Sequence, residues 1–197
     1  MTGRTPLRTA AAGTITAILA ALVLAADQFT KHLALENLPY QEPVPVFGDV
    51  LQFYLTRNPG AAFSLGEGVT WIFTIVLAAA AVTIVVLTLR VVRSRLWAVV
   101  LGLLLGGILG NLTDRLLREP GFLIGHVIDF INTPWLWLGM RPAIYNVADM
   151  FIVTMMITVA ILVLVGLRFD GTREKDHVKA PAVDDGTPAA PDEAAKA

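Results

Sequence analysis

Residues 126–150 begin His126-Val-Ile-Asp129-Phe-Ile, continue through a Pro- and Trp-rich connector, and end Tyr145-Asn146-Val-Ala-Asp149-Met150. An uncharged apolar run follows directly and reaches Leu167. A helix over this run is long enough to cross a bilayer core, which takes about 20 residues. An acid inside such a segment is expensive and marks a candidate functional site. If the fold brings Asp129 and Asp149 together, they can share one proton and act as an acid/base pair.

The rest of the chain is also too apolar for an ordinary soluble domain. Of its 197 residues only 16% are charged, and the mean hydropathy is +0.66. The sequence predicts a mainly α membrane protein with four transmembrane helices, near residues 9–31, 68–89, 96–114 and 143–167. The first span resembles a signal peptide, but bulky residues occupy the expected cleavage site, so we expect it to be retained.

The distribution of basic residues predicts the orientation in the membrane. Arginine and lysine collect before the first span, between the second and third spans, and after the fourth span. The positive-inside rule therefore places both termini in the cytoplasm and the loops 32–67 and 115–142 outside. We expect residues 1–169 to form one membrane domain and residues 170–197 to form a disordered cytoplasmic tail. The chain has no cysteine, which excludes disulfides and thiol nucleophiles.

The first outer loop combines a strand pattern with a turn of small residues. Residues 50–56 are rich in aromatic and branched side chains, which favours a short strand. The sequence Asn58-Pro-Gly60-Ala-Ala-Phe-Ser64 follows, and its small residues let a backbone approach another chain closely. This segment suits a surface that cradles an extended peptide. A re-entrant turn that packs on the bilayer is the plainer alternative.

Asp27 and Lys31 lie at the outer end of the first span, four residues apart. On a continuous helix they share a face and can form an ion pair. Two roles are then open: a direct part in the active site, or an interfacial anchor in which Lys31 extends toward water.

The third span ends in a second polar group. Gly106 and Gly110 have the spacing that allows close helix contact in lipid. Polar residues follow within about two turns, and they predict either a buried hydrogen-bonded cluster or an ion pair at the helix end: Asn111, Asp114, Arg115 and Arg118.

Pro142 is a suitable first residue for the fourth helix. A helix that starts there places Asp149 roughly 9–10 Å along its axis, within reach of outside water. Asn146 would then lie on the same face and could orient the carboxylate. Three aromatic residues are expected in the outer aromatic belt: Trp135, Trp137 and Tyr145.

Together these features resemble one family, the lipoprotein signal peptidases (signal peptidase II). Five motifs occur in the family's order: Asp27-Gln-x-x-Lys31, Asn58-x-Gly60-Ala-Ala-Phe-Ser64, Gly106-Gly-x-x-Gly110-Asn111-x-x-Asp114-Arg115, Val127-x-Asp129-Phe130 and Asn146-x-Ala-Asp149. The resemblance extends from about Asp27 to Asp149, and the segment beyond Arg168 lies outside it.

The resemblance implies an aspartyl endopeptidase of the bacterial inner membrane with a small β-structured cradle outside its four helices. Such an enzyme removes signal peptides from prolipoproteins on the N-terminal side of a diacylglyceryl-modified cysteine. The catalytic positions match Asp129 and Asp149. We expect a site near the outer face that opens sideways between helices, with the outer loop closing over it.

The remaining motif residues are expected to support this pair. Candidates for holding the substrate backbone or the two aspartates are Asn58, Gly60, Asn111, Arg115 and Asn146. Candidates for structural polar support are Asp27, Lys31 and Asp114. No metal or other cofactor is expected, because the sequence shows no cluster of metal ligands. His126 lies close to Asp129, but a lone histidine beside an acid is typical of a local hydrogen-bond partner rather than of a ligand.

Three other functions fit parts of the sequence. A small proton-coupled transporter could use the same acids, although no internal repeat is visible. A Ser64–Lys31 pair could serve a different peptidase chemistry. A membrane scaffold without enzymatic activity would not require the two aspartates.

Overall fold

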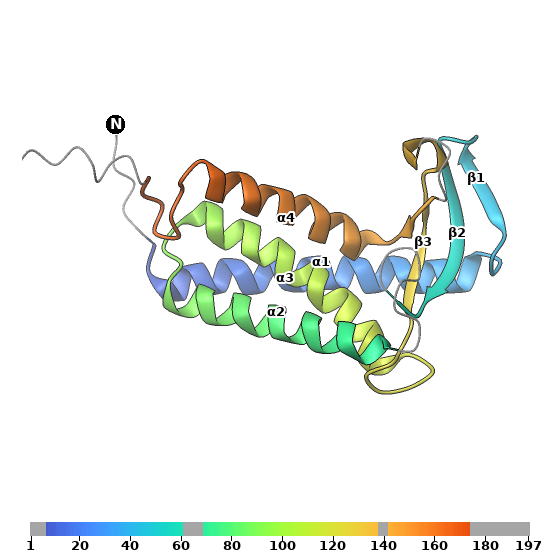
Figure 1. Ribbon diagram of the computed structural model, residues 1–197, viewed down its shortest axis with the longest axis horizontal. Helices are drawn as coiled ribbons and strands as arrows, with labels where there is room; N and C mark the ends of the chain where they lie inside the picture. Colours follow the sequence, from blue (N-terminus) through green and yellow to red (C-terminus); the bar gives the residue numbers. More distant parts are fainter. Residues whose placement is uncertain (1–6, 61–68, 138–141, 174–197) are drawn as a thin grey trace, which may run out of the picture.

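The computed structural model describes residues 7–60, 69–137 and 142–173. Within this part of the chain, four long helices lie side by side and a small sheet stands at one end of the bundle (Figure 1). In chain order the elements are α1 (Thr9–Asn37), β1 (Pro43–Phe47), β2 (Leu51–Asn58), α2 (Thr70–Arg90), α3 (Arg95–Leu117), β3 (Val127–Asn132), the 3₁₀ helix η2 (Pro134–Trp137), β4 (Ile144–Tyr145) and α4 (Val147–Leu164).

Helix α3 is the centre of the bundle. It packs against α1, α2 and α4, and most of its side chains are buried, whereas α2 and α4 hardly touch each other. The outer faces of α2 and α4 carry large exposed apolar side chains, which suits a lipid environment. All four helices are long and apolar enough to cross a membrane, so the predicted fold class is confirmed.

Glycines let α3 approach two neighbouring helices closely. A Cβ atom at Gly106 would lie 2.6 Å from Val23 Cβ of α1, and one at Gly107 would lie 2.7 Å from the Ala148 carbonyl oxygen of α4. Such distances leave no room for a side chain. The small-residue spacing seen in the sequence therefore marks a real helix contact.

The sheet is antiparallel, with the order β1-β2-β3-β4. Strand β2 contains the segment predicted to be extended, and it pairs with β3 so that Thr56 faces Asp129. A small apolar core beneath the sheet includes Ala34 of α1 together with Leu55 and Phe130. The sheet therefore places Asp129 next to the ends of the helices.

Helix α1 continues beyond the expected end near Lys31 and reaches Asn37. Leu33, Ala34, Leu35 and Glu36 are good helix formers, and no proline occurs between Lys31 and Pro39. The extra turns supply Ala34 to the core beneath the sheet, which stabilises the longer helix.

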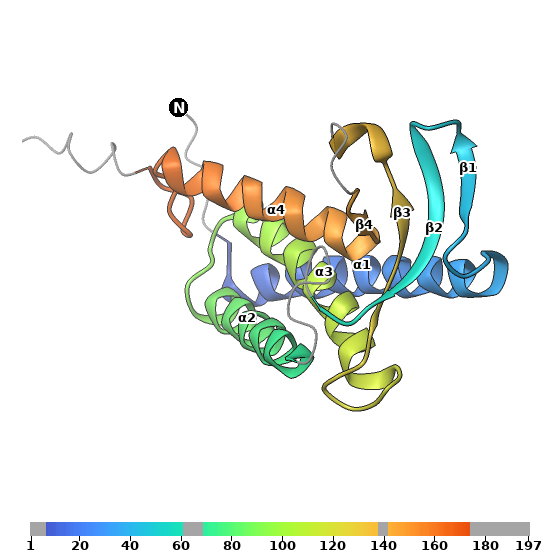
Figure 2. The same ribbon diagram turned by 45° about the vertical axis from the view of Figure 1, so that its right-hand side comes forward.

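Helix α4 starts later than expected. Pro142 is not helical, Ile144 and Tyr145 pair with β3 as strand β4, and the helix begins at Val147 (Figure 2). A helix that started at Pro142 would have placed Asp149 roughly 9–10 Å along its axis. This prediction is wrong, because Asp149 lies in the first turn of α4. Pairing with β3 outweighs the helix-start preference of Pro142 because the strand satisfies backbone groups that would otherwise be unpaired.

The segment after α4 folds back onto the opposite end of the bundle from the sheet. Phe169 lies against Trp97, with ring centroids 4.5 Å apart, and its carbonyl oxygen accepts hydrogen bonds from the backbone of Arg93 and Ser94. The turn continues through Arg173, so the first residues of the predicted tail are ordered. Residues 174–197 lie outside the described part of the chain.

We predict that Gly106→Ala destabilises the protein by about 1–3 kcal/mol, because the added methyl overpacks the contact between α3 and α1. Gly13→Ala is the matched control. A Cβ atom there would lie 3.5 Å from Leu89, an ordinary contact, and the better helix propensity of alanine is worth up to about 1 kcal/mol. Thermal unfolding in detergent measures both, and equal stability of the two variants would contradict the prediction.

Candidate active site

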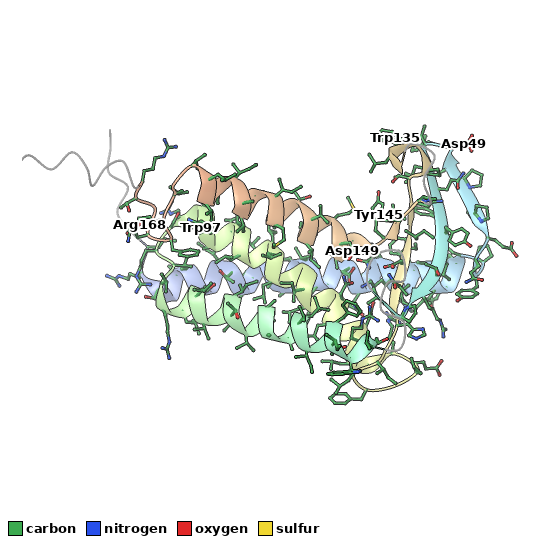
Figure 3. The ribbon with its side chains drawn as sticks, viewed as in Figure 1. Asp49, Trp97, Trp135, Tyr145, Asp149 and Arg168 are labelled. Atoms are coloured by element: carbon green, nitrogen blue, oxygen red, sulfur yellow. The ribbon has the colours of Figure 1, made fainter. Side chains whose placement is uncertain are left out.

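The sheet and α4 bring Asp129 and Asp149 to one cavity. Asp129 lies in β3 and is only 2% exposed, and Asp149 lies in the first turn of α4. Both line a cavity of about 590 Å³ at the junction of the bundle and the sheet, where Figure 3 shows Asp149. Four of the five residues expected to hold the substrate or the aspartates also line this cavity: Asn58, Gly60, Asn111 and Arg115. The fifth, Asn146, does not line it.

Asn146 joins the two aspartates. Its Nδ2 donates to Asp129 Oδ1 at 2.6 Å, and its backbone N–H donates to Asp149 Oδ2 at 3.1 Å. In return, Asp149 N–H donates to Asn146 Oδ1 at 3.0 Å, which completes a capping box at the start of α4. One fully buried residue therefore fixes both carboxylates, and it acts as the helix cap rather than as a neighbour on the helix face.

Two further amides direct N–H groups at the pair. Asn58 Nδ2 donates to Asp129 Oδ2 at 3.0 Å, while its Oδ1 accepts from the Gly60 backbone N–H. Asn111 Nδ2 donates to Asp149 Oδ1 at 2.7 Å. Each oxygen of both carboxylates thus accepts a hydrogen bond, which satisfies these buried polar atoms.

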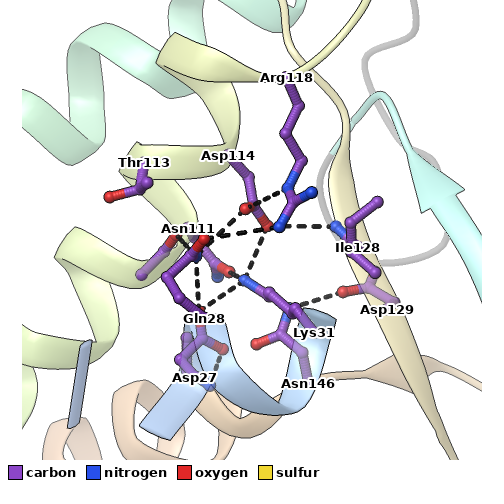
Figure 4. Close-up of polar contacts among 12 residues, drawn as sticks. Asp27, Gln28, Lys31, Asn111, Thr113, Asp114, Arg118, Ile128, Asp129 and Asn146 are labelled. Atoms are coloured by element: carbon purple, nitrogen blue, oxygen red, sulfur yellow. Dashed lines mark hydrogen bonds and ion pairs between the residues drawn. The ribbon is translucent and has the colours of Figure 1, made fainter. Parts of the chain in front are cut away.

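A buried ion cluster lies behind the aspartates (Figure 4). Lys31 is completely buried, and its Nζ lies 2.8 Å from Asp27 Oδ2, 2.8 Å from Asp114 Oδ2 and 3.0 Å from Asn111 Oδ1. The expected pairing of Asp27 with Lys31 is confirmed. The alternative of an interfacial anchor is wrong, because the ammonium points inward.

The acids of this cluster also hold the elements that carry the aspartates. Asp27 Oδ1 accepts from the Ala148 backbone N–H of α4 at 2.9 Å. Asp114 Oδ2 accepts from the Ile128 backbone N–H of β3 at 3.2 Å, and its Oδ1 pairs with Arg118 at 2.6 Å. The predicted buried cluster at the end of the third helix is therefore confirmed, and it reaches both β3 and α4.

Arg115 binds the backbone of its own chain. Its guanidinium donates to the carbonyl oxygens of Asn58, Pro59 and Gly125, each at 3.0 Å, and to that of Gly60. These contacts fix the turn after β2 and place Asn58 beside Asp129. Arg115 also lines the cavity, but most of its hydrogen-bonding capacity serves this turn.

Burial raises the pKa of Asp129 from its ordinary value of 3.8 to about 7, and the nearby charge of Asp149 adds to the rise. Hydrogen bonds from Asn58 and Asn146 and the positive charge of Lys31 oppose it. A pKa in this range suits an acid/base group that works near neutral pH.

Some residues of the site gave no signal in the sequence. Helix α2, which contributes no residue to the five motifs, supplies one apolar wall of the cavity with Phe73, Val76 and Leu77. Thr70 Oγ1 donates to the Pro59 carbonyl oxygen at 2.6 Å and so helps to fix the same turn. Gln28 donates to Asp27, Asp114 and the Gly110 carbonyl oxygen, and only its place in the first motif could have drawn attention to it.

Two expectations depend on residues that the structure does not describe or describes in part. Ser64, the alternative nucleophile, and the rest of the outer loop at 61–68 lie outside the described residues. Trp135 is 58% exposed beside the sheet, and its predicted place in an aromatic belt stays a prediction.

Comparison with known proteins bears on this arrangement. A family model described as signal peptidase (SPase) II matches residues 19–165. The chain belongs to the signal peptidase II family. A lipoprotein signal peptidase of Leifsonia xyli is 47% identical over 163 residues, which cover 83% of this chain and 73% of the relative. One of Rhodococcus jostii is 45% identical over 157 residues, which cover 80% of this chain and 76% of the relative.

Solved structures agree with the family assignment. A bacterial membrane enzyme determined by the in meso method at 2.3 Å resolution superposes with a TM-score of 0.66 and 28% identity, over 76% of this chain and 87% of that chain. This member of the family is therefore a bacterial membrane protein and a peptidase that acts on prolipoproteins. The predicted family is confirmed, and the transporter alternative is not favoured.

The raised pKa of Asp129 predicts how stability depends on pH. Between about pH 4 and pH 7 the folded protein holds a proton that the unfolded chain has released, so its free energy of unfolding falls as pH rises. Asp129→Asn removes the contribution of Asp129 to this dependence.

We therefore expect the unfolding temperature of Asp129→Asn, relative to that of the parent, to increase from pH 4 to pH 7. Thermal unfolding in detergent across this range measures the slope. The slopes are compared rather than the absolute unfolding temperatures, because loss of the hydrogen bonds to Asp129 also changes the overall stability of the variant. Parallel curves for parent and variant would contradict the raised pKa.

Proposed function

We propose that this peptidase is an aspartyl endopeptidase in which Asp129 and Asp149 form the catalytic pair. The observation that carries the proposal is that two carboxylates from different elements line one cavity and are both bonded to Asn146. Two acids so placed cannot both ionise easily, so the pair retains one proton around neutral pH. The pair titrates as a unit.

The chemistry follows from this shared proton. The ionised carboxylate takes a proton from a water molecule, whose oxygen attacks the scissile carbonyl carbon, while the protonated carboxyl donates to the carbonyl oxygen. The tetrahedral intermediate then collapses and the C–N bond breaks. The leaving amine takes the proton that the first carboxylate removed from water, and the former carbonyl oxygen returns its proton to the second carboxylate, so the pair again holds one proton. The hydrogen bonds from Asn58, Asn111 and Asn146 hold the carboxylates in place throughout, so little reorganisation is needed.

The cavity walls suit a lipid-modified substrate. Its sides are apolar, with Phe73 and Leu77 on α2 and Ile152 and Val153 on α4. Because α2 and α4 hardly touch each other, acyl chains can remain in the bilayer while the peptide bond beside them reaches the aspartates. This arrangement supports cleavage on the N-terminal side of a diacylglyceryl-modified cysteine, as the family resemblance implies.

In the proposed orientation, both termini are cytoplasmic and the sheet and cavity lie near the outer face of the inner membrane. Arginines gather at the end of the bundle opposite the sheet, including Arg90, Arg93 and Arg168, of which Figure 3 labels the last.

The two aspartates can be tested directly with purified protein and a diacylglyceryl-modified prolipoprotein. Asp129→Asn and Asp149→Asn should each lower the cleavage rate on the order of 100- to 10,000-fold, because each removes one partner of the acid/base pair. Asp49→Asn, in the exposed turn between β1 and β2, is the matched control and should cleave like the parent. Substantial activity in either site variant, with the protein folded, would refute the aspartyl mechanism.

Orientation can be tested because the chain has no native cysteine. A membrane-impermeant maleimide applied to intact spheroplasts should label Asp49→Cys, in the turn between β1 and β2. It should label Asp170→Cys, in the turn after α4, only after the membrane is permeabilised. The reverse pattern would invert the proposed topology.

A further inference from the structure

We infer that Lys31 is a positioning residue of the catalytic pair, which acts by fixing the amide orientation of Asn111. The inference rests on the proposed function of Asp129 and Asp149. Lys31 does not touch either carboxylate; it reaches Asp149 through one intermediate residue. Orientation of Asn111 is therefore a second role of Lys31, in addition to its support of the fold.

The amide of Asn111 lies between two charged groups of opposite sign. Its Oδ1 accepts from Lys31 Nζ at 3.0 Å and from Asn146 Nδ2 at 3.2 Å. Its Nδ2 donates to Asp149 Oδ1 at 2.7 Å. A flipped amide would set N–H groups against the ammonium and an oxygen against the carboxylate. The two charges therefore dictate the orientation that delivers a donor to Asp149.

All three N–H groups of the Lys31 ammonium have oxygen partners. It has three N–H groups and three oxygen partners, on Asp27, Asp114 and Asn111, and it is completely buried. Two of these partners are charged and one is neutral. The two acids thus keep the ammonium in place, and the third N–H is available to act on the amide of Asn111.

The other two amides of the site obtain their orientation differently. Asn58 Oδ1 accepts from the Gly60 backbone N–H, and Asn146 Oδ1 accepts from the Asp149 backbone N–H. Backbone donors are supplied by the local fold, whatever the neighbouring side chains. Asn111 lies inside helix α3, where the backbone N–H groups are already paired. Lys31 therefore replaces a backbone donor that the helix cannot provide.

The charge of Lys31 also acts on the pair at longer range, since it lowers the pKa of Asp129. Removing this charge should raise that pKa and move the pH–rate profile toward higher pH. The elements packed around Asp129 carry the following charged and titratable groups: Asp149 on α4; Asp27, Lys31, His32 and Glu36 on α1; Arg95, Asp114 and Arg115 on α3, with Arg118 directly after it; Tyr54 and Arg57 on β2; His126 before β3; and Tyr145 on β4. Of these groups, Lys31→Met and Arg118→Gln each change one, and Asn111→Ala changes none.

A double-mutant cycle tests the inference. We expect Lys31→Met and Asn111→Ala each to lower kcat on the order of 100-fold, the scale of losing one preorganised donor. The double variant should be no slower than Asn111→Ala alone, because Lys31 has nothing left to orient. The pH–rate profile of Lys31→Met should also move to higher pH, a change that a purely structural role would not cause.

Arg118→Gln is the matched control. It removes another cation paired with Asp114 and does not touch Asn111, so kcat should stay within a few-fold of the parent and the pH profile should stay in place. If Lys31→Met does not fold, the cycle is repeated in an Asp27→Asn background, where the buried charge is balanced again. Failure of this compensated variant to fold would itself overturn the inference, because it would show that Lys31 is needed mainly for folding.

Asp129→Asn measured beside the cycle separates the two proposals. If Asp129→Asn keeps its activity, the aspartyl mechanism fails and the inference fails with it. If Asp129→Asn is inactive, two results would overturn only the role of Lys31. One is that the reductions in kcat of Lys31→Met and Asn111→Ala multiply in the double variant. The other is that Lys31→Met retains the parent's kcat.

Discussion

The buried ammonium of Lys31 between the carboxylates of Asp27 and Asp114 is the interaction on which the rest of the site depends. Charges removed from water cost several kcal/mol each unless they are paired and hydrogen-bonded. Here every N–H of the ammonium has an oxygen partner. The same two acids also accept backbone N–H groups from α4 and β3. One neutralised cluster therefore joins α1, α3, α4 and the sheet at a single point.

The ion cluster of Lys31, Asp27 and Asp114 explains how a membrane protein can hold two further acids near lipid. Asp129 and Asp149 are attached to elements that the cluster has already fixed, and their oxygens all accept hydrogen bonds from amides or backbone. Ionisation of the pair is therefore controlled by fixed groups rather than by bulk water. Apolar side chains of α2 and α4 line the sides of the cavity without adding further charge.

Close packing and polar chemistry meet on α3. Its glycines bring α1 and α4 near enough for Asp27 to reach the start of α4. A larger side chain at Gly110 would contact Asp27 directly, because a Cβ atom there would lie 2.5 Å from Asp27 Oδ2. The glycine positions thus set the geometry of the ion cluster as well as the spacing of the helices.

The sequence alone was enough to predict the four helices, the β2 strand, the family, and Asp129 and Asp149 as the candidate acids of the site. In lipid, the backbone N–H and C=O groups of a long uncharged run must bond within the segment, as they do in a helix. Acids within or beside such runs are rare and therefore indicate a candidate site. Other features depended on contacts between distant residues. Pairing of Ile144 and Tyr145 with β3 moved the start of α4 to Val147, against the local preference of Pro142. The inward direction of Lys31 and the role of α2 as a cavity wall were likewise decided only by tertiary structure, because periodicity within one helix does not specify which neighbours its faces will meet.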